Sequence, residues 1–158
     1  MRFLVTKERV GRNGVNHELH DKDFYAWTKE TAQLLKSGKI NEVDIMNIAE
    51  EIEDMGSSDK RGVVSQLSRL ISHLLKWKYQ PVLRGNSWRN TIKGSRIEIS
   101  DFFDDSPSLK NEVLSKLGVA YKKALYVASN ETGIDEKIFP KECPVTLEQC
   151  LDSEFFPD

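Results

Sequence analysis

The strongest helical pattern of the chain is VVSQLSRLISHLL, residues 63–75. Its apolar residues recur at spacings of three and four, so on an α-helix they form one broad stripe suited to packing against other helices. The pattern ends near Gln80-Pro81, because the residue before a proline disfavours the helical conformation. No segment alternates apolar and polar residues over a useful length, and strands are therefore not expected.

Four further segments with helical periodicity surround this one. They start at Asp21, at Asn41 or Asp44, at Ser87 and at Ser106-Pro107. Each start offers a residue type that caps helices, and Thr132-Gly133 is a typical stop for the last segment. Residues 56–59, Gly-Ser-Ser-Asp, are expected to interrupt or bend the pattern between the second and third helices. A further short helix fits residues 146–151. Five amphipathic helices joined by short loops predict an all-α bundle.

The ends of the chain differ from its helical middle. Residues 1–20 are polar with little periodicity, and they predict a flexible N-terminal arm. Residues 21–158 are expected to form a single helical domain, because 158 residues match the usual size of one domain. The C-terminal tail is rich in proline, with Pro140, Pro144 and Pro157.

Composition and cysteine usage narrow the class of protein. With 39% hydrophobic and 30% charged residues, the chain fits a globular protein. No apolar run approaches the roughly 20 residues that span a bilayer, and the N-terminus is too short for a signal-peptide core. Membrane association is therefore not expected. Cys143 and Cys150 have no paired metal-binding spacing, which favours a reduced cytoplasmic protein over one with a disulfide.

Charge is strongly segregated along the chain. Residues 1–55 carry 8 basic and 11 acidic side chains, residues 56–97 carry 9 and 1, and residues 98–158 carry 6 and 13. A basic middle between acidic ends either binds an anion or is neutralised by its own flanks.

The acidic run AEEIEDM, residues 49–55, divides into two groups on a helical projection. The second helix has an apolar stripe made of Ile45, Ile48, Ile52 and Met55. At about 100° per residue, Glu50 and Glu53 point away from this stripe, and both are expected to be solvated. A polar ridge follows the edge of the stripe at positions i, i+3, i+7 and i+10, and it consists of Asp44, Asn47, Glu51 and Asp54.

Three interpretations of Glu51 and His73 remain open. In the favoured one, the polar ridge pairs with Arg89 and Arg96 across a helix interface, and a carboxylate or carbonyl satisfies His73. In the second, Glu51 and His73 bind a metal from adjacent helices, although the Glu-x-x-His spacing is absent and His17 and His20 lie in the arm. In the third, they form an acid–base pair without a nucleophile motif. No catalytic residue, metal or cofactor is predicted. The candidate polar site comprises Glu51, Asp54, His73, Arg89 and Arg96.

The basic segment 60–96 interleaves cations with aromatic residues. This mixture suits nucleic acid, because cations neutralise phosphate and aromatic rings stack on unpaired bases. A partner protein with an acidic surface would use the same patch. Alternatively the aromatic rings are core anchors, which is the favoured interpretation of Trp88. The candidate contacts to an anion or nucleic acid are Lys76, Lys78, Arg84 and Lys93, with Arg89 and Arg96 beside them.

Several ordered blocks of the chain resemble a bacterial family called domain of unknown function twenty-nine, common in cyanobacteria and proteobacteria. The blocks are DFYAWTKETAQLLKSGKINEVD (23–44), AEEIEDMG (49–56), SHLLKWKYQP (72–81), SWRNTI (87–92), DSPSL (105–109), ETGI (131–134) and FPKECPVTLEQCLDSEFFP (139–157). The resemblance covers roughly residues 21–157 and implies an all-helical fold without a defined activity, substrate or cofactor. It also implies that members of the family typically have the same residue types at the positions of Glu50, Glu51, Glu53, His73, Lys76, Trp88 and Arg96.

These observations favour a small helical interaction or regulatory module, with a protein partner or a second copy of the chain as its ligand. The first alternative is a nucleic-acid-binding protein that uses the basic segment 60–96. The second is a metal-binding protein or acid–base enzyme centred on Glu51 and His73.

Overall fold

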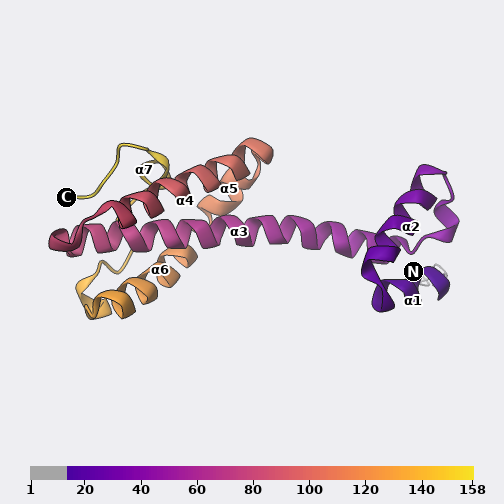
Figure 1. Ribbon diagram of the computed structural model, residues 1–158, viewed down its shortest axis with the longest axis horizontal. Coiled ribbons are helices and arrows are strands. Elements are labelled where there is room, and N and C mark those ends of the chain that lie inside the picture. The colour runs from indigo at the N-terminus through magenta and orange to yellow at the C-terminus, as the bar shows by residue number, and fades with distance from the viewer. Residues whose placement is uncertain (1–13) are drawn as a thin grey trace, which may run out of the picture. The chain divides into compact units, whose positions relative to one another are not determined.

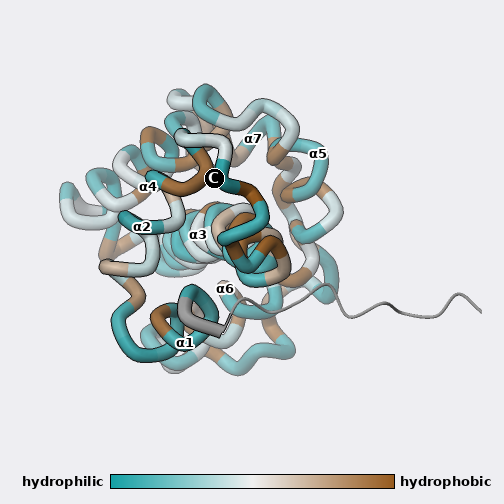
Figure 2. Tube along the Cα trace, turned by 90° about the vertical axis from the view of Figure 1, so that its right-hand side faces the viewer, coloured by the Kyte–Doolittle hydropathy of each residue, from teal (hydrophilic) through white to brown (hydrophobic). Residues whose placement is uncertain are grey.

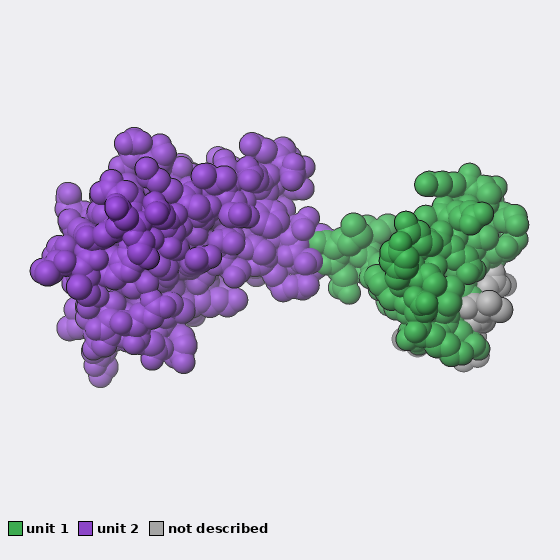
Figure 3. All heavy atoms as spheres, viewed as in Figure 1, with its two compact units in different colours: residues 1–55 green, residues 56–158 purple. Residues whose placement is uncertain are grey.

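A computed structural model describes residues 14–158 of the chain, and within them every regular element is a helix. The predicted all-α class is thereby confirmed (Figure 1). No helix in this part of the chain is both long enough and apolar enough to span a membrane. The chain divides into two compact units, residues 1–55 and residues 56–158, which Figure 3 shows in different colours.

The described part of unit 1 contains two helices, a 3-10 turn and the beginning of a third helix. These are α1 (Gly14–Lys22), α2 (Phe24–Lys36), η1 (Ile40–Glu42) and the first turns of α3 (Ile45–Tyr79). The helix α1 lies where the sequence predicts a flexible arm, so residues 14–20 are ordered; residues 1–13 of the predicted arm lie outside the described part. The cap of α2 is Asp23 rather than the predicted Asp21, and its side chain accepts a hydrogen bond from the amide of Ala26.

The helix α3 is continuous over 35 residues, so the predicted break at residues 56–59 does not occur. Glycine in a helix costs about 1 kcal/mol relative to alanine but creates no steric block. The apolar stripe at the start of α3, predicted to face the core, also differs from the prediction. Ile45, Ile52 and Met55 are exposed, Ile52 by 63% and Met55 by 69%. The reason is that α1 meets α3 along its polar ridge and leaves these apolar side chains uncovered within unit 1.

Unit 2 is built around the rest of α3. Its elements are η2 (Pro81–Leu83), α4 (Asn86–Asp105), α5 (Leu109–Leu114), α6 (Leu117–Thr132), η3 (Glu136–Ile138) and α7 (Leu147–Leu151). The helices α4, α5 and α7 lie on one side of α3 and α6 on the other (Figure 1), and Figure 2 shows the hydropathy of the same trace. The quoted stripe forms the core as predicted, with Val63, Val64, Leu67, Leu70, Ile71, Leu74 and Leu75 all buried.

The last predicted long helix is divided in two. It ends at Leu114 and resumes at Leu117, with Ser115 and Lys116 between α5 and α6. The predicted stop is confirmed, because Gly133 ends α6 with φ of 71°, a left-handed conformation that favours glycine. The predicted helix at residues 146–151 is also confirmed as α7, with Thr146 and Gln149 forming a capping box. A single domain over residues 21–158 was expected, whereas the boundary between the two compact units falls within α3.

Candidate functional site

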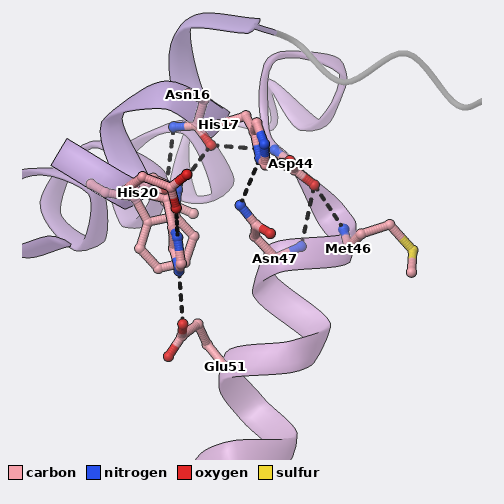
Figure 4. Close-up of polar contacts among 10 residues, drawn as sticks. Asn16, His17, His20, Asp44, Met46, Asn47 and Glu51 are labelled. Carbon is pink, nitrogen blue, oxygen red and sulfur yellow. Dashed lines mark hydrogen bonds and ion pairs between the residues drawn. The ribbon is translucent and has the colours of Figure 1, made fainter. Parts of the chain in front are cut away.

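The polar ridge of α3 faces the histidines of α1, both within unit 1 (Figure 4). The Oε1 atom of Glu51 lies 2.8 Å from Nε2 of His20, whose Nδ1 lies 3.0 Å from Oδ1 of Asp21. Hydrogen bonds to Asp21 and to Glu51 raise the pKa of His20 above its usual value. His20 also makes edge contacts with the rings of Phe24 and Trp27. The imidazole of His20 therefore links α1 to α3.

The second histidine contact lies one turn closer to the start of α3. Nδ1 of His17 is 3.0 Å from Oδ2 of Asp44 and 3.1 Å from the amide Nδ2 of Asn47. The other carboxylate oxygen of Asp44 accepts hydrogen bonds from the backbone amides of Met46 and Asn47, and so caps α3. The buried carboxylate of Asp44 is thus satisfied by both the helix terminus and His17.

Asn16 connects three segments of unit 1 from a buried position. Its Oδ1 accepts hydrogen bonds from the indole of Trp27 (3.2 Å) and from the backbone amide of Asp44 (3.3 Å). Its Nδ2 donates to the hydroxyl of Thr31 (3.3 Å). One amide side chain therefore joins α1, α2 and the start of α3.

These contacts differ from the predicted pairing of the ridge with Arg89 and Arg96. Glu51 pairs with His20, and Glu51 and His73 lie about six turns apart on the same helix rather than facing each other from adjacent helices. Asp54 is exposed. Within the described residues, no group of three or more histidine, cysteine, aspartate or glutamate side chains is placed to hold a metal ion.

A second polar cluster in unit 2 is centred on the buried side chain of Lys76. Its Nζ donates to Oε2 of Glu131 on α6 and lies 3.2 Å from Nε2 of His73. The ammonium also lies 5.3 Å from the ring centroid of Trp88 on α4. Lys76 thus joins α3, α4 and α6, and a favoured cation–π contact adds to the ion pair.

His73 is a neutral acceptor in this cluster. Its Nδ1 donates to the backbone carbonyl of Arg69 at 2.9 Å, which leaves Nε2 to accept from Lys76. Burial lowers the pKa of His73, and the neighbouring Lys76 cation lowers it further. The carbonyl contact is one of the two partners that the favoured interpretation assigned to His73.

Arg96 holds the C-terminal segment against the helices. Its guanidinium donates to the backbone carbonyls of Cys150 (2.8 Å), Ser153 (3.2 Å) and Phe155 (2.6 Å). Burial lowers the pKa of Arg96, but the three carbonyl oxygens compensate its buried charge. The predicted acidic partners are thus replaced by carbonyl groups.

The remaining basic candidates are all exposed, and two of them also make contacts within unit 2. Arg84 donates from Nε to the carbonyl of Trp77 at 2.8 Å, and Arg89 lies over the rings of Trp77 and Phe156. Lys78 and Lys93 are exposed. Lys78 also lines a cavity of about 240 Å³ whose apolar walls come from α3 and the C-terminal segment. Part of the basic segment is therefore engaged in contacts within unit 2.

Sequence reasoning missed four residues that organise these clusters, namely Asn16, His17, His20 and Glu131. The i, i+3 spacing of His17 and His20 was the available signal, since both side chains lie on one face if residues 14–22 are helical.

A family model named domain of unknown function DUF29 matches residues 19–156. The chain belongs to this family. The match agrees with the sequence resemblance in its extent. No curated protein and no solved structure was found to match the chain.

Proposed function

We propose that the DUF29 chain is a helical interaction module whose binding surface is the apolar stripe of α3 in unit 1. The observation that carries the proposal is the exposure of Ile45, Ile52 and Met55 on one side of a helix. Single exposed apolar residues are ordinary, but a helical row of them is typical of a surface that binds another helix. A regulatory role would follow from competition for this surface.

The other candidate site residues that form the polar clusters have a structural role: they hold helices together. The carboxylates of Asp44 and Glu51 are engaged by His17 and His20, and Lys76 is engaged by Glu131. These ionic groups orient helices, whereas the stripe beside them is open to solvent. We propose that the polar ridge holds unit 1 together and that the neighbouring stripe binds the partner.

We also propose that the module works in the cytoplasm. Cys143 and Cys150 are both free thiols, which a reducing compartment maintains. Burial raises the pKa of Cys150 to about 12, so this thiol stays protonated and unreactive at neutral pH.

Site-specific cross-linking in cells tests the proposed surface. A photo-reactive benzophenone amino acid replaces Ile52, and in a control it replaces Glu50, which lies about 160° away around the helix. We expect discrete cross-linked products from position 52 and few from position 50. Products of equal yield from both positions, or none from position 52, would show that the stripe is not a binding surface.

A further inference from the structure

A second exposed apolar surface lies at the turn after α3. We call it the basic tip, and it consists of Lys78, Val82, Leu83 and Arg84. Val82 is 94% exposed and Leu83 is exposed as well. Lys78 and Arg84 are also exposed, and the Nε of Arg84 donates to the Trp77 carbonyl, which fixes its guanidinium at this turn. The tip therefore presents apolar groups beside cations.

The stripe and the basic tip lie in segments of opposite charge. Residues 40–59, which contain the stripe, carry seven acidic and no basic side chains, of which five are exposed while Asp44 and Glu51 contact histidines. Residues 76–97, which contain the tip, carry six basic and no acidic side chains, of which four are exposed while Lys76 and Arg96 are buried. Two stripes brought together would place two acidic segments side by side, which opposes association. A stripe against a tip buries apolar side chains on both partners and matches opposite charges.

We propose that the chain pairs with a second copy of itself, the apolar stripe of each copy binding the basic tip of the other. The proposal rests on the stripe being a binding surface, as proposed above, and it adds the identity of the partner. Two reciprocal contacts of this kind close a two-fold dimer, the commonest form of homo-oligomer. Because both sides are charged, the association weakens as ionic strength rises.

Two substitutions at exposed positions test the pairing without disturbing the core. Ile52→Lys places a cation in the stripe opposite the basic tip, and Val82→Glu places a carboxylate in the tip opposite the acidic segment. We expect each variant alone to associate at least tenfold more weakly than the unmodified chain in sedimentation equilibrium. Glu50→Lys changes net charge in the same direction as Ile52→Lys but lies away from the stripe, and it is expected to weaken pairing less than Ile52→Lys does. Melting curves followed by circular dichroism verify that all variants remain folded.

Mixing the two weakened variants gives the decisive result. In a mixed pair, one contact joins the unaltered stripe to the unaltered tip. The other contact joins the lysine introduced at position 52 of one copy to the glutamate introduced at position 82 of the other, a favourable pair. We therefore expect the equimolar mixture of the Ile52→Lys and Val82→Glu variants to associate within a few-fold of the unmodified chain. A mixture that stays dissociated would overturn the reciprocal pairing.

The failure of this inference and the failure of the proposed function give different results. A chain that remains monomeric at about 100 μM would overturn self-pairing, because weak specific contacts between proteins form in the micromolar range. If the benzophenone at position 52 then cross-links to a different protein, the interaction surface stands and only the partner is wrong. If position 52 cross-links to nothing, the proposed function itself fails.

Discussion

Asn16 in unit 1 and Leu67 in unit 2 occupy central buried positions but are opposite in kind. Asn16 makes three hydrogen bonds to its surroundings, whereas Leu67 is fully buried in the apolar core. The buried apolar side chains of the described part of unit 1 are Trp27 and Val43, while the whole continuous apolar core lies in unit 2. Hydrogen bonds contribute about 1 kcal/mol each, and a buried leucine contributes several times more. We therefore expect unit 1, which carries the exposed stripe, to be the less stable unit.

The largest expected effect concerns the apolar core of unit 2. Leu67→Ala should lower the free energy of unfolding by about 2–5 kcal/mol, because it removes buried methyl groups and leaves a cavity. Urea unfolding followed by circular dichroism measures the change. Ile52→Ala in the exposed stripe is the matched control and should change stability by less than about 0.5 kcal/mol. Equal losses in the two variants would contradict the contrast between core and stripe.

Arg96→Met should have the next largest effect. It should lower the free energy of unfolding by about 2–4 kcal/mol, because three backbone carbonyls lose a charged donor. Hydrogen exchange should show faster exchange over residues 147–156 than elsewhere in unit 2. Lys93→Met on the same helix is exposed and serves as the control, with a change within about 0.5 kcal/mol. If residues 147–156 keep their protection in the Arg96 variant, the guanidinium is not what holds this segment.

Asn16→Ala should destabilise unit 1 by about 1–3 kcal/mol, since the indole of Trp27 and the amide of Asp44 lose their acceptor. Hydrogen exchange over residues 16–47 measures the loss, and residues 63–75 report on unit 2 in the same sample. If the two units are stabilised separately, exchange should become faster in residues 16–47 and stay unchanged in residues 63–75. Asn130→Ala, which removes one exposed side-chain hydrogen bond, is the control.

The smallest expected effect is on the pH dependence of stability, which has opposite signs in the two units. The change in the free energy of unfolding is below about 1 kcal/mol in each. The raised pKa of His20 means that its contacts with Asp21 and Glu51 stabilise unit 1 fully below about pH 6.5, and that this stabilisation is lost as pH rises through the folded pKa. The lowered pKa of His73 means that its contribution to unit 2 is present above about pH 6.5 and is lost as pH falls through the folded pKa.

Nuclear magnetic resonance titration of the imidazole ring protons measures both histidines in one sample. We expect His20 to titrate above 6.5 and His73 below it. Glu51→Gln should move the pKa of His20 downward and leave that of His73 unchanged, because Glu51 contacts only the first of them. A shift of both values would show that the two histidines are not held in separate environments, and a shift of neither would show that Glu51 does not raise the pKa of His20.

Much of unit 2 was predictable from the sequence because its helices bury a wide apolar stripe. The spacing of Val63 to Leu75 identified the central helix, and Gly133 identified the end of α6 through its conformational preference. In unit 1 the same reasoning placed Ile45, Ile52 and Met55 in a core, which is wrong. Periodicity shows that residues share a face of a helix, but not whether a neighbouring element covers that face.

The candidate site was predictable in part for a similar reason. Helical geometry alone placed Asp44, Asn47 and Glu51 on one line, and all three contact the histidines of α1. Their partners were not predictable, because residues 14–22 have a weak helical pattern and any cation or proton donor would have suited the ridge. The pairing of Lys76 with Glu131 likewise joins residues far apart in the sequence.

The helical class, the apolar stripe of residues 63–75, the polar ridge and the opposite charges of residues 40–59 and 76–97 follow from composition and from spacing along one chain. The contact of Glu51 with His20, the binding of carbonyl groups by Arg96 and the exposure of the stripe in unit 1 emerge only in the folded structure. Such contacts depend on which helices become neighbours, and this is determined by packing and hydrogen bonding over the whole unit rather than by any local pattern.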